Sequence, residues 1–394
     1  MNEPHPVFDC DNHYYEALDA FTRHLDPRLG SRVIEWCEIN GRKYHVIGGK
    51  VSHAVTNPTF DPVSPAGAMA DYFRGNASGK SPKEYLGRPE PINPGYRDPA
   101  ERVKIMDAQG IDKVWMFPTL GMIYEEPLKH DPYAVSWMFK AFNRYLLDDW
   151  KFNHEDRIFT APYISLAILE SAIEELEFAL DNGARTIVMR PAAPTTPLGR
   201  FSPADPMFDP FWARVNEAGI TVVVHAGDSG QSSNGYAEEG FGATFGGFGA
   251  YRPSIKGFNI ERAVYDFLAT LLFDNLFVRF PNLRIASVEN GAEFLPDMFR
   301  KFKSTAKKMP GYFQEDPTET FKRHVWINPF WEDDIEEVVD HVGVDRILFG
   351  SDWPHAEGLV HPLDYLNEIK MYDPVEQRKI LRDNTTALTE LQPA

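Results

Sequence analysis

Residues 7–13 read VFDCDNH, an apolar start followed by acids and a histidine, and this stretch decides the fold. Side chains alternate along a strand, so Asp9, Asp11 and His13 are expected on one face. A dinucleotide-binding fold would place Gly-x-Gly-x-x-Gly directly after its first strand. Acids and a histidine stand there instead. They favour a (β/α)8 barrel, whose chemistry is built at the carboxyl ends of the strands.

Short apolar runs alternate with amphipathic helical stretches along the rest of the chain, which is typical of βαβ units. Several runs are continuously apolar, as parallel strands buried on both faces are. Eight alternations predict an α/β fold, a TIM-type barrel forming one domain over residues 1–394. The expected strands are 7–11, 113–117, 158–164, 186–189, 221–225, 284–288, 325–328 and 346–349. The expected helices include 169–181, 206–218, 259–273 and 332–341.

Two segments interrupt this alternation. Residues 31–97 are rich in Pro, Gly, Asn and Ser, and residues 226–257 are similar, so we interpret both as long insertions after strands one and five. In a barrel both leave from the carboxyl-terminal rim, and loops of this length are usually lids or disordered. The glycine-rich stretch 240–249 lacks the Gly-Lys-Ser/Thr ending of a phosphate-binding loop, so we interpret it as a loop.

Acidic residues dominate the charge, with 58 Asp and Glu against 40 Lys and Arg and a formal net charge of −18. Nucleic acid and anionic membranes are therefore improbable partners, because both are bound through clustered Lys and Arg. The chain opens without a basic and then apolar leader and has no long uncharged apolar run, so we expect a cytoplasmic protein. We expect a small-molecule substrate and a homo-oligomer.

Imidazoles and carboxylates stand where several expected strands end. Strand five ends in His225, strand six in Glu289, and strand eight runs into GSDWPH at residues 350–355. Taken singly, His225 fits a hydrogen-bonded rim residue and Asp352 fits a helix N-cap. Such groups converging with those of strand one would be costly to desolvate together unless a cation compensated them. Their co-occurrence predicts a divalent metal site.

Through motifs that span most of its length, the chain resembles the amidohydrolase superfamily. It is most similar to the amidohydrolase-related branch that includes aminocarboxymuconate semialdehyde decarboxylase. The motifs are Asp-x-His-x-x-Glu at 11–16, Asn143, His-Ala-Gly at 225–227, Arg-Phe-Pro-x-Leu-Arg-Ile at 279–285, Glu-Asn-Gly at 289–291 and Gly-Ser-Asp-Trp-Pro-His at 350–355. The resemblance implies that Asp11, His13, His225 and Asp352 bind a divalent metal. It also implies that Asp352 accepts a proton from water.

Two positions depart from the decarboxylase pattern, because relatives tend to carry His where Asp11 and Glu289 stand here. We interpret Glu289 and His355 either as groups that orient ligands and transfer protons or as additional ligands. In the second case three imidazoles and three carboxylates could hold two cations. The ion is expected to be Zn, Mn or Fe, with one or two bound.

Aromatic residues make up 13% of the chain, and Tyr15, Trp331 and Trp353 lie close to expected ligands. Each one fits core packing, but together they predict a partly apolar substrate pocket. Arg190 ends strand four, where it would bind a substrate anion or pair with a rim acid. We therefore expect a small substrate that carries a carboxylate or ester.

Three functions remain open at this point. The first is metal-dependent hydrolysis or non-oxidative decarboxylation, with Asp352, Glu289 or His355 moving protons. The second is a dinuclear non-haem iron oxygenase, a minority type within the same branch. The third is a non-catalytic barrel, which the intact set of expected ligands disfavours.

Overall fold

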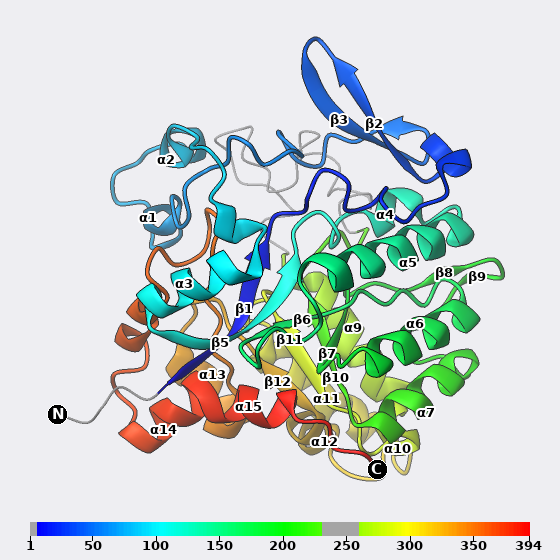
Figure 1. The fold of residues 1–394 in the computed structure, drawn as a ribbon. Coiled ribbons are helices and arrows are strands. Elements are labelled where there is room, and N and C mark those ends of the chain that lie inside the picture. The colour runs from blue at the N-terminus through cyan, green and yellow to red at the C-terminus, as the bar shows by residue number, and fades with distance from the viewer. Residues whose placement is uncertain (1–5, 231–259) are drawn as a thin grey trace.

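The computed structural model describes residues 6–230 and 260–394, and its centre consists of short parallel strands surrounded by helices (Figure 1). The strands form two sheets, with the orders β1-β5-β6 and β12-β11-β10-β7. Their bounds are β1 Val7–Tyr14, β5 Ile111–Pro118, β6 Ile158–Thr160, β7 Thr186–Met189, β10 Thr221–His225, β11 Ile285–Val288 and β12 Val325–Ile327. Every residue of β1, β7, β10 and β11 is buried, which accounts for the mainly apolar sequences of β7, β10 and β11.

Backbone hydrogen bonds outside these strands join the two sheets. Residues 162–164 exchange two hydrogen bonds of 2.9 and 3.0 Å with Val188 of β7. Residues 347–349 donate one bond to β12 and accept one from β1, each 2.8 Å long. The prediction of a regular strand at 346–349 is wrong, because a 3-10 turn occupies Val344–Arg346 and the segment after it only bridges its neighbours. Within the described residues, the strands and this bridging segment follow one another in cyclic order.

Helices cover the outside of the strands (Figure 1). Asp side chains cap α3, α5, α12, α13 and α14, and all but α13 carry Pro in the first turn, where its missing amide costs nothing. The helix expected at 169–181 is α6, while that expected at 206–218 begins with a 3-10 turn at Pro206–Phe208. The principal helices are α3 Pro99–Gln109, α5 Pro132–Asp149, α6 Leu169–Asp181, α7 Asp209–Ala218, α9 Arg262–Phe273, α11 Leu295–Lys308, α12 Pro317–His324, α13 Ile335–Val342, α14 Pro374–Arg378 and α15 Asn384–Thr389. Shorter helices are α1 Ala70–Phe73, α2 Pro82–Leu86, α4 Glu125–Leu128 and α10 Leu276–Arg279.

The insertion at 31–97 has secondary structure of its own. It forms an antiparallel sheet of β2 Ile34–Ile39, β3 Arg42–Ile47 and β4 Lys50–Val51, which projects from the carboxyl-terminal side of β1 (Figure 1). At its base, His45 is buried with Nδ1 2.8 Å from the Tyr124 hydroxyl. Of the insertion expected at 226–257, only residues up to 230 are described, so most of it and the glycine-rich stretch 240–249 lie outside the described residues.

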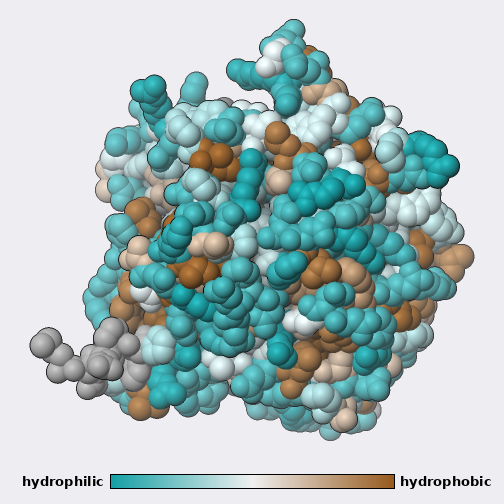
Figure 2. Space-filling model, in the orientation of Figure 1, coloured by the Kyte–Doolittle hydropathy of each residue, from teal (hydrophilic) through white to brown (hydrophobic). Residues whose placement is uncertain are grey.

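The face of the molecule in Figure 2 is largely hydrophilic, with scattered hydrophobic patches, and the tip of the β2–β3 hairpin is among its hydrophilic parts. This surface agrees with the strongly acidic composition. Among the helices that the structure describes, none has the length and apolar character needed to cross a membrane.

Candidate metal centre

The carboxyl ends of β1, β10 and β11 bring four of the predicted residues together. The Nε2 atoms of His13 and His225 lie 3.3 and 3.4 Å from the same oxygen, Oδ1 of Asp11. Oε2 of Glu289 lies 3.5 Å from His13 Nε2 and 3.3 Å from His225 Nε2. Asp11, His13 and His225 are buried, and Glu289 is partly buried. The predicted alternation along strand one is confirmed for Asp11 and His13, which reach the same site.

These side chains fit a divalent ion. Ligand atoms about 2.1 Å from one ion lie ~3.0 to 3.4 Å apart in octahedral or tetrahedral geometry, close to the separations observed here. Neither ring nitrogen of the buried His13 has a hydrogen-bond partner. His225 Nδ1 donates to the carbonyl of Ala226 at 2.8 Å, which leaves Nε2 unprotonated in the neutral ring and directed at the cluster.

A second group of donors adjoins the first. Asp352 Oδ1 lies 3.4 Å from His13 Nε2 and 2.6 Å from His355 Nδ1. Potential ligand atoms of His13, Glu289, Asp352 and His355 all lie within 4.8 Å of one another, as do those of Asp11, His13, His225 and Glu289. The geometry therefore puts Glu289 with the three ligands expected from strands one and five. Asp352 belongs to the adjoining group.

The ring of His355 lies between the Thr119 hydroxyl and the carboxyl of Asp352. The Thr119 hydroxyl donates to the carbonyl of Tyr14 at 3.1 Å, so its 3.0 Å contact with His355 Nε2 is one in which it accepts. Nδ1 of the neutral ring then carries no hydrogen, and it lies 2.6 Å from Asp352 Oδ1. Burial raises the pKa of Asp352 well above its usual range and lowers the pKa of His355 well below its own. Both directions put the proton on Asp352.

The electrostatics of the first group favour a positive charge at its centre. Burial by itself would lower the pKa of His13, but the contacts with Asp11 and Glu289 outweigh it and raise that pKa to about 9. Burial likewise opposes ionisation of Asp11, yet His13 and His225 hold the pKa of its carboxyl below the usual range. Without a metal, a protonated His13 supplies the charge that a cation would supply.

The backbone is strained at two of the donors, Glu289 and Asp352. Glu289 and Asp352 have φ of 56° and 54°, in the left-handed region that side chains other than Gly seldom occupy. Such strain persists where the surrounding structure enforces it, typically at functional sites. Gly350 lies so close to the site that a Cβ there would come 2.5 Å from Cβ of Asp11.

The three aromatic residues predicted to bind substrate each contact a different part of the protein. Tyr15 is buried, with its ring centre 5.9 Å from that of His355. Trp331 donates to the carbonyl of Glu357 at 3.2 Å. Trp353 packs on the buried guanidinium of Arg102, with 4.5 Å from Cζ to the ring centre.

Arg190 has an acidic partner, which was one of its two predicted roles. It is buried, donates to Glu126 Oε2 at 2.6 Å, and lies 3.4 Å from an oxygen of Glu125. Its guanidinium is therefore already matched by two carboxylates at the rim.

Sequence reasoning missed the role of Asp9 and Arg102, which contact residues next to the donors. Asp9 is fully buried and accepts hydrogen bonds from the amide and hydroxyl of Ser351 and from Asn12. Alternation predicted Asp9 on the face of Asp11 and His13, but the strand register shifts between Asp9 and Asn12, and Asp9 contacts Asn12 instead of joining the donors. Arg102 gave no sequence signal, because it lies on the outer helix α3.

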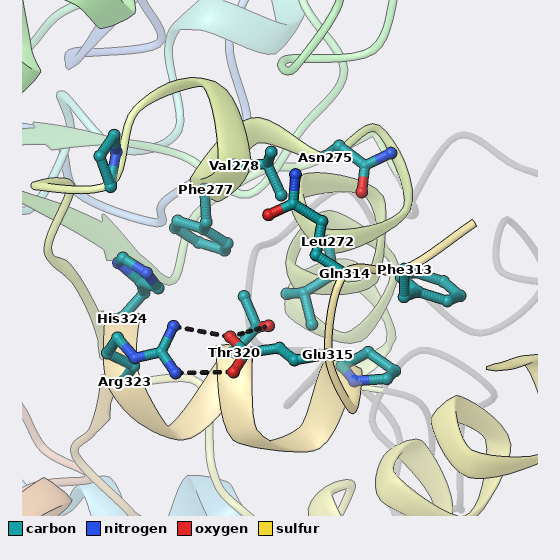
Figure 3. Close-up of a pocket in the computed structure, with 12 residues that line it drawn as sticks. Leu272, Asn275, Phe277, Val278, Phe313, Gln314, Glu315, Thr320, Arg323 and His324 are labelled. Atoms are coloured by element: carbon teal, nitrogen blue, oxygen red, sulfur yellow. Dashed lines mark hydrogen bonds and ion pairs between the residues drawn. The ribbon is translucent and has the colours of Figure 1, made fainter. Parts of the chain in front are cut away.

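A pocket of about 350 Å³ lies away from this centre (Figure 3). It is lined by residues of α9, α10 and α12, including His324, Arg323 and Phe277. His324 ends α12 immediately before β12 begins, so this pocket is at the amino-terminal side of the strands, opposite the donors.

Comparison with known proteins agrees with the site. The family model described as amidohydrolase matches residues 9–389. An amidohydrolase of known structure from Mycobacterium avium subsp. paratuberculosis is 39% identical over 99% of this chain and 100% of its own, with a TM-score of 0.91. No curated protein matches.

More distant structures share the fold. A 2,6-dihydroxybenzoate decarboxylase from Rhizobium is 19% identical over 81% of this chain and 94% of its own, with a TM-score of 0.58. A 5-carboxyvanillate decarboxylase from Novosphingobium aromaticivorans, complexed with manganese, is 15% identical over 98% of this chain and 97% of its own, with a TM-score of 0.63. Because the family model spans nearly the whole chain, this protein belongs to the amidohydrolase family.

Proposed function

We propose that this protein is a divalent-metal-dependent enzyme on a (β/α)8 barrel that hydrolyses or non-oxidatively decarboxylates a small organic acid or ester. The observation that carries the proposal is the convergence of Asp11, His13, His225 and Glu289, with nitrogen-to-oxygen separations of 3.3 to 3.5 Å. The structurally similar decarboxylases act on hydroxylated aromatic acids, which supports a substrate of that class.

The metal would be held by Asp11, His13, His225 and Glu289. When bound, a divalent ion supplies positive charge that polarises a substrate oxygen. In decarboxylation the bond between the ring carbon and the carboxylate breaks, carbon dioxide leaves, and the electron pair on carbon takes the proton held by Asp352. In hydrolysis Asp352 would instead give its proton to the leaving group, and its carboxylate would then take a proton from the attacking water.

Metal content and a matched pair of substrates test this function. The purified protein, reconstituted with Mn²⁺, should hold a stoichiometric divalent ion. It should be assayed with 2,6-dihydroxybenzoate and its methyl ester. Release of carbon dioxide from the acid assigns decarboxylation, and release of methanol from the ester assigns hydrolysis. A protein that retains no divalent ion after reconstitution would overturn the proposal. The surface variant His24→Ala, whose histidine is exposed, is the control for ligand variants.

A dinuclear non-haem iron oxygenase is the second candidate. It is favoured by the two adjoining groups of donors, which share His13 and Glu289 and contain three imidazoles and three carboxylates in all. None of the relatives named above is an oxygenase. About two irons per chain, together with oxygen consumption when a reductant is added, would establish this candidate. One tightly held ion and no oxygen uptake would exclude it.

The state of assembly is a further part of the proposal. We propose a homo-oligomeric cytoplasmic enzyme in which the β2–β3 hairpin meets a neighbouring subunit. Light scattering on the purified protein gives the mass of the particle directly. A monomer at micromolar concentration would contradict the expected homo-oligomer.

A further inference from the structure

Arg102 is an arginine buried without a carboxylate in direct contact. Its side chain comes from α3 and is fully inaccessible to solvent. All three donor nitrogens are used: Nε donates to the carbonyl of Gly95 at 2.7 Å, Nη1 to Asn12 Oδ1 at 2.5 Å and Nη2 to the carbonyl of His13 at 2.5 Å. Burial lowers its pKa to about 9, so it remains a cation at neutral pH. Burying a charge costs free energy, which is offset here by the hydrogen bonds that hold Arg102 in one position.

The contacts of Arg102 lead directly to the donors of the metal centre. It holds the carbonyl of His13, whose ring is central to both groups of donors. Through Asn12 it reaches Asp9, since Asn12 Nδ2 donates to Asp9 Oδ2 at 2.9 Å. Asp9 then accepts from the amide and hydroxyl of Ser351 at 3.0 and 2.5 Å. Ser351 immediately precedes Asp352.

A stacked ring completes the arrangement. The guanidinium lies 4.5 Å from the ring centre of Trp353, the residue that follows Asp352. The amide of Asp352 also donates to the carbonyl of Asp11 at 2.9 Å. One side chain thus contacts two of the segments that supply donors, β1 and residues 351–353, although these lie at opposite ends of the sequence. The two segments belong to the seam where the bridging segment meets β1.

We propose that Arg102 is a positioning residue of the metal centre, fixing His13 and the Asp352 segment relative to each other through Asn12, Asp9 and Trp353. The inference rests on the proposed function, because it concerns the geometry of the proposed site. Groups behind a metal ligand set the orientation of that ligand, and their loss typically weakens metal affinity by about 10- to 100-fold.

A matched control separates positioning from stability. Arg284 is likewise buried and donates to the backbone carbonyls of Gly219, Ala387 and Glu390. It lies immediately before β11, at the amino-terminal end of the strands and away from the donors. Arg102→Met and Arg284→Met each leave buried carbonyls unpaired, so both should lower the melting temperature.

The test is a calorimetric titration of Mn²⁺ into metal-free protein. Arg102→Met should bind Mn²⁺ about 10- to 100-fold more weakly than the wild type, whereas Arg284→Met should retain wild-type affinity. Arg102→Lys, which keeps the charge but has fewer donors, should recover part of the loss. Equal affinity in Arg102→Met and wild type, or an equal loss in both methionine variants, would overturn the inference. Failure of the wild type to bind any divalent ion would instead refute the proposed function.

Ser351→Ala provides the same test if Arg102→Met does not fold. It removes only the hydroxyl that donates to Asp9 and leaves the amide contact intact. A folded Ser351→Ala protein should bind Mn²⁺ several-fold more weakly than the wild type, because the Asp352 segment loses one of the two hydrogen bonds by which Ser351 holds Asp9. Unchanged Mn²⁺ affinity in Ser351→Ala would mean that the hydrogen bonds from Arg102 through Asn12 and Asp9 do not influence the metal centre.

Discussion

The substitution Gly350→Ala tests the metal centre through sterics alone. An added Cβ would lie 2.5 Å from Cβ of Asp11 and 2.8 Å from the amide atoms of Asn328. Ordinary contacts between such atoms begin near 3.4 Å, so Asp11 must retreat by about 1 Å. Overpacking of this kind costs about 1 to 3 kcal/mol in stability. A ligand displaced by about 1 Å leaves the tolerance of a preorganised site, so we expect metal affinity to fall about 100-fold.

The assay compares metal affinity with stability. Mn²⁺ affinity is measured by calorimetry and unfolding by urea titration, for wild type, Gly350→Ala and Gly183→Ala. Gly183 has φ of 82° and nothing within 4 Å of an added Cβ, so its substitution strains the backbone without touching the site. We expect Gly183→Ala to lose stability alone. A folded Gly350→Ala protein with wild-type affinity would refute the idea that Asp11 is a ligand held against this glycine.

Three other predictions follow from the site and from the hairpin base. His225→Ala should lose both metal and turnover, and Asp352→Ala should lose turnover but keep the metal, while circular dichroism shows that both variants are folded. A full metal complement in His225→Ala would remove His225 as a ligand, and loss of metal in Asp352→Ala would make Asp352 one. Since contacts raise the pKa of His13 to about 9, Mn²⁺ must displace a proton at lower pH. Affinity measured between pH 6 and 8 should therefore rise about tenfold per unit. Burial lowers the pKa of His45 to about 3, so the unfolded state takes up its proton first as pH falls below about 6.5. Stability should decline by about 2 kcal/mol between neutral pH and pH 5, a loss that urea titration should find absent in His45→Phe.

Strand positions were predictable where a strand is buried on both faces, because such a strand has a run of apolar residues. Thr221–His225 is continuously apolar because both its faces are covered, and the pattern located it to the residue. Residues 347–349 are equally apolar, but a 3-10 turn precedes them, and a bridging segment differs from a strand only in how many hydrogen bonds it makes. Residues 31–97 gave no periodicity because their strands are short and the burial of β2 and β3 does not alternate along the strand.

The composition of the donor set was predictable, but its grouping was not. Alternation along one strand suffices to put Asp11 and His13 on the same face. The membership of Glu289 in the first group depends on its left-handed backbone, with φ of 56°, which no residue preference indicates for Glu. The role of Arg102 depends on a contact between side chains 90 residues apart in the sequence. Contacts of that kind are fixed by tertiary packing and leave no local pattern.

The distribution of donors between the two sheets gives the metal a structural role as well as a chemical one. Asp11 and His13 belong to the sheet of β1, whereas His225 and Glu289 stand at the end of the sheet of β10 and β11. These sheets are otherwise joined at their seams by a few backbone hydrogen bonds. An ion held by donors from both sheets would cross-link them, and binding that favours the folded state stabilises it by mass action. The left-handed backbone at Glu289 would then be held in place by the bonds between the donors and the ion. Loss of the metal would therefore lower the stability of the fold as well as the activity.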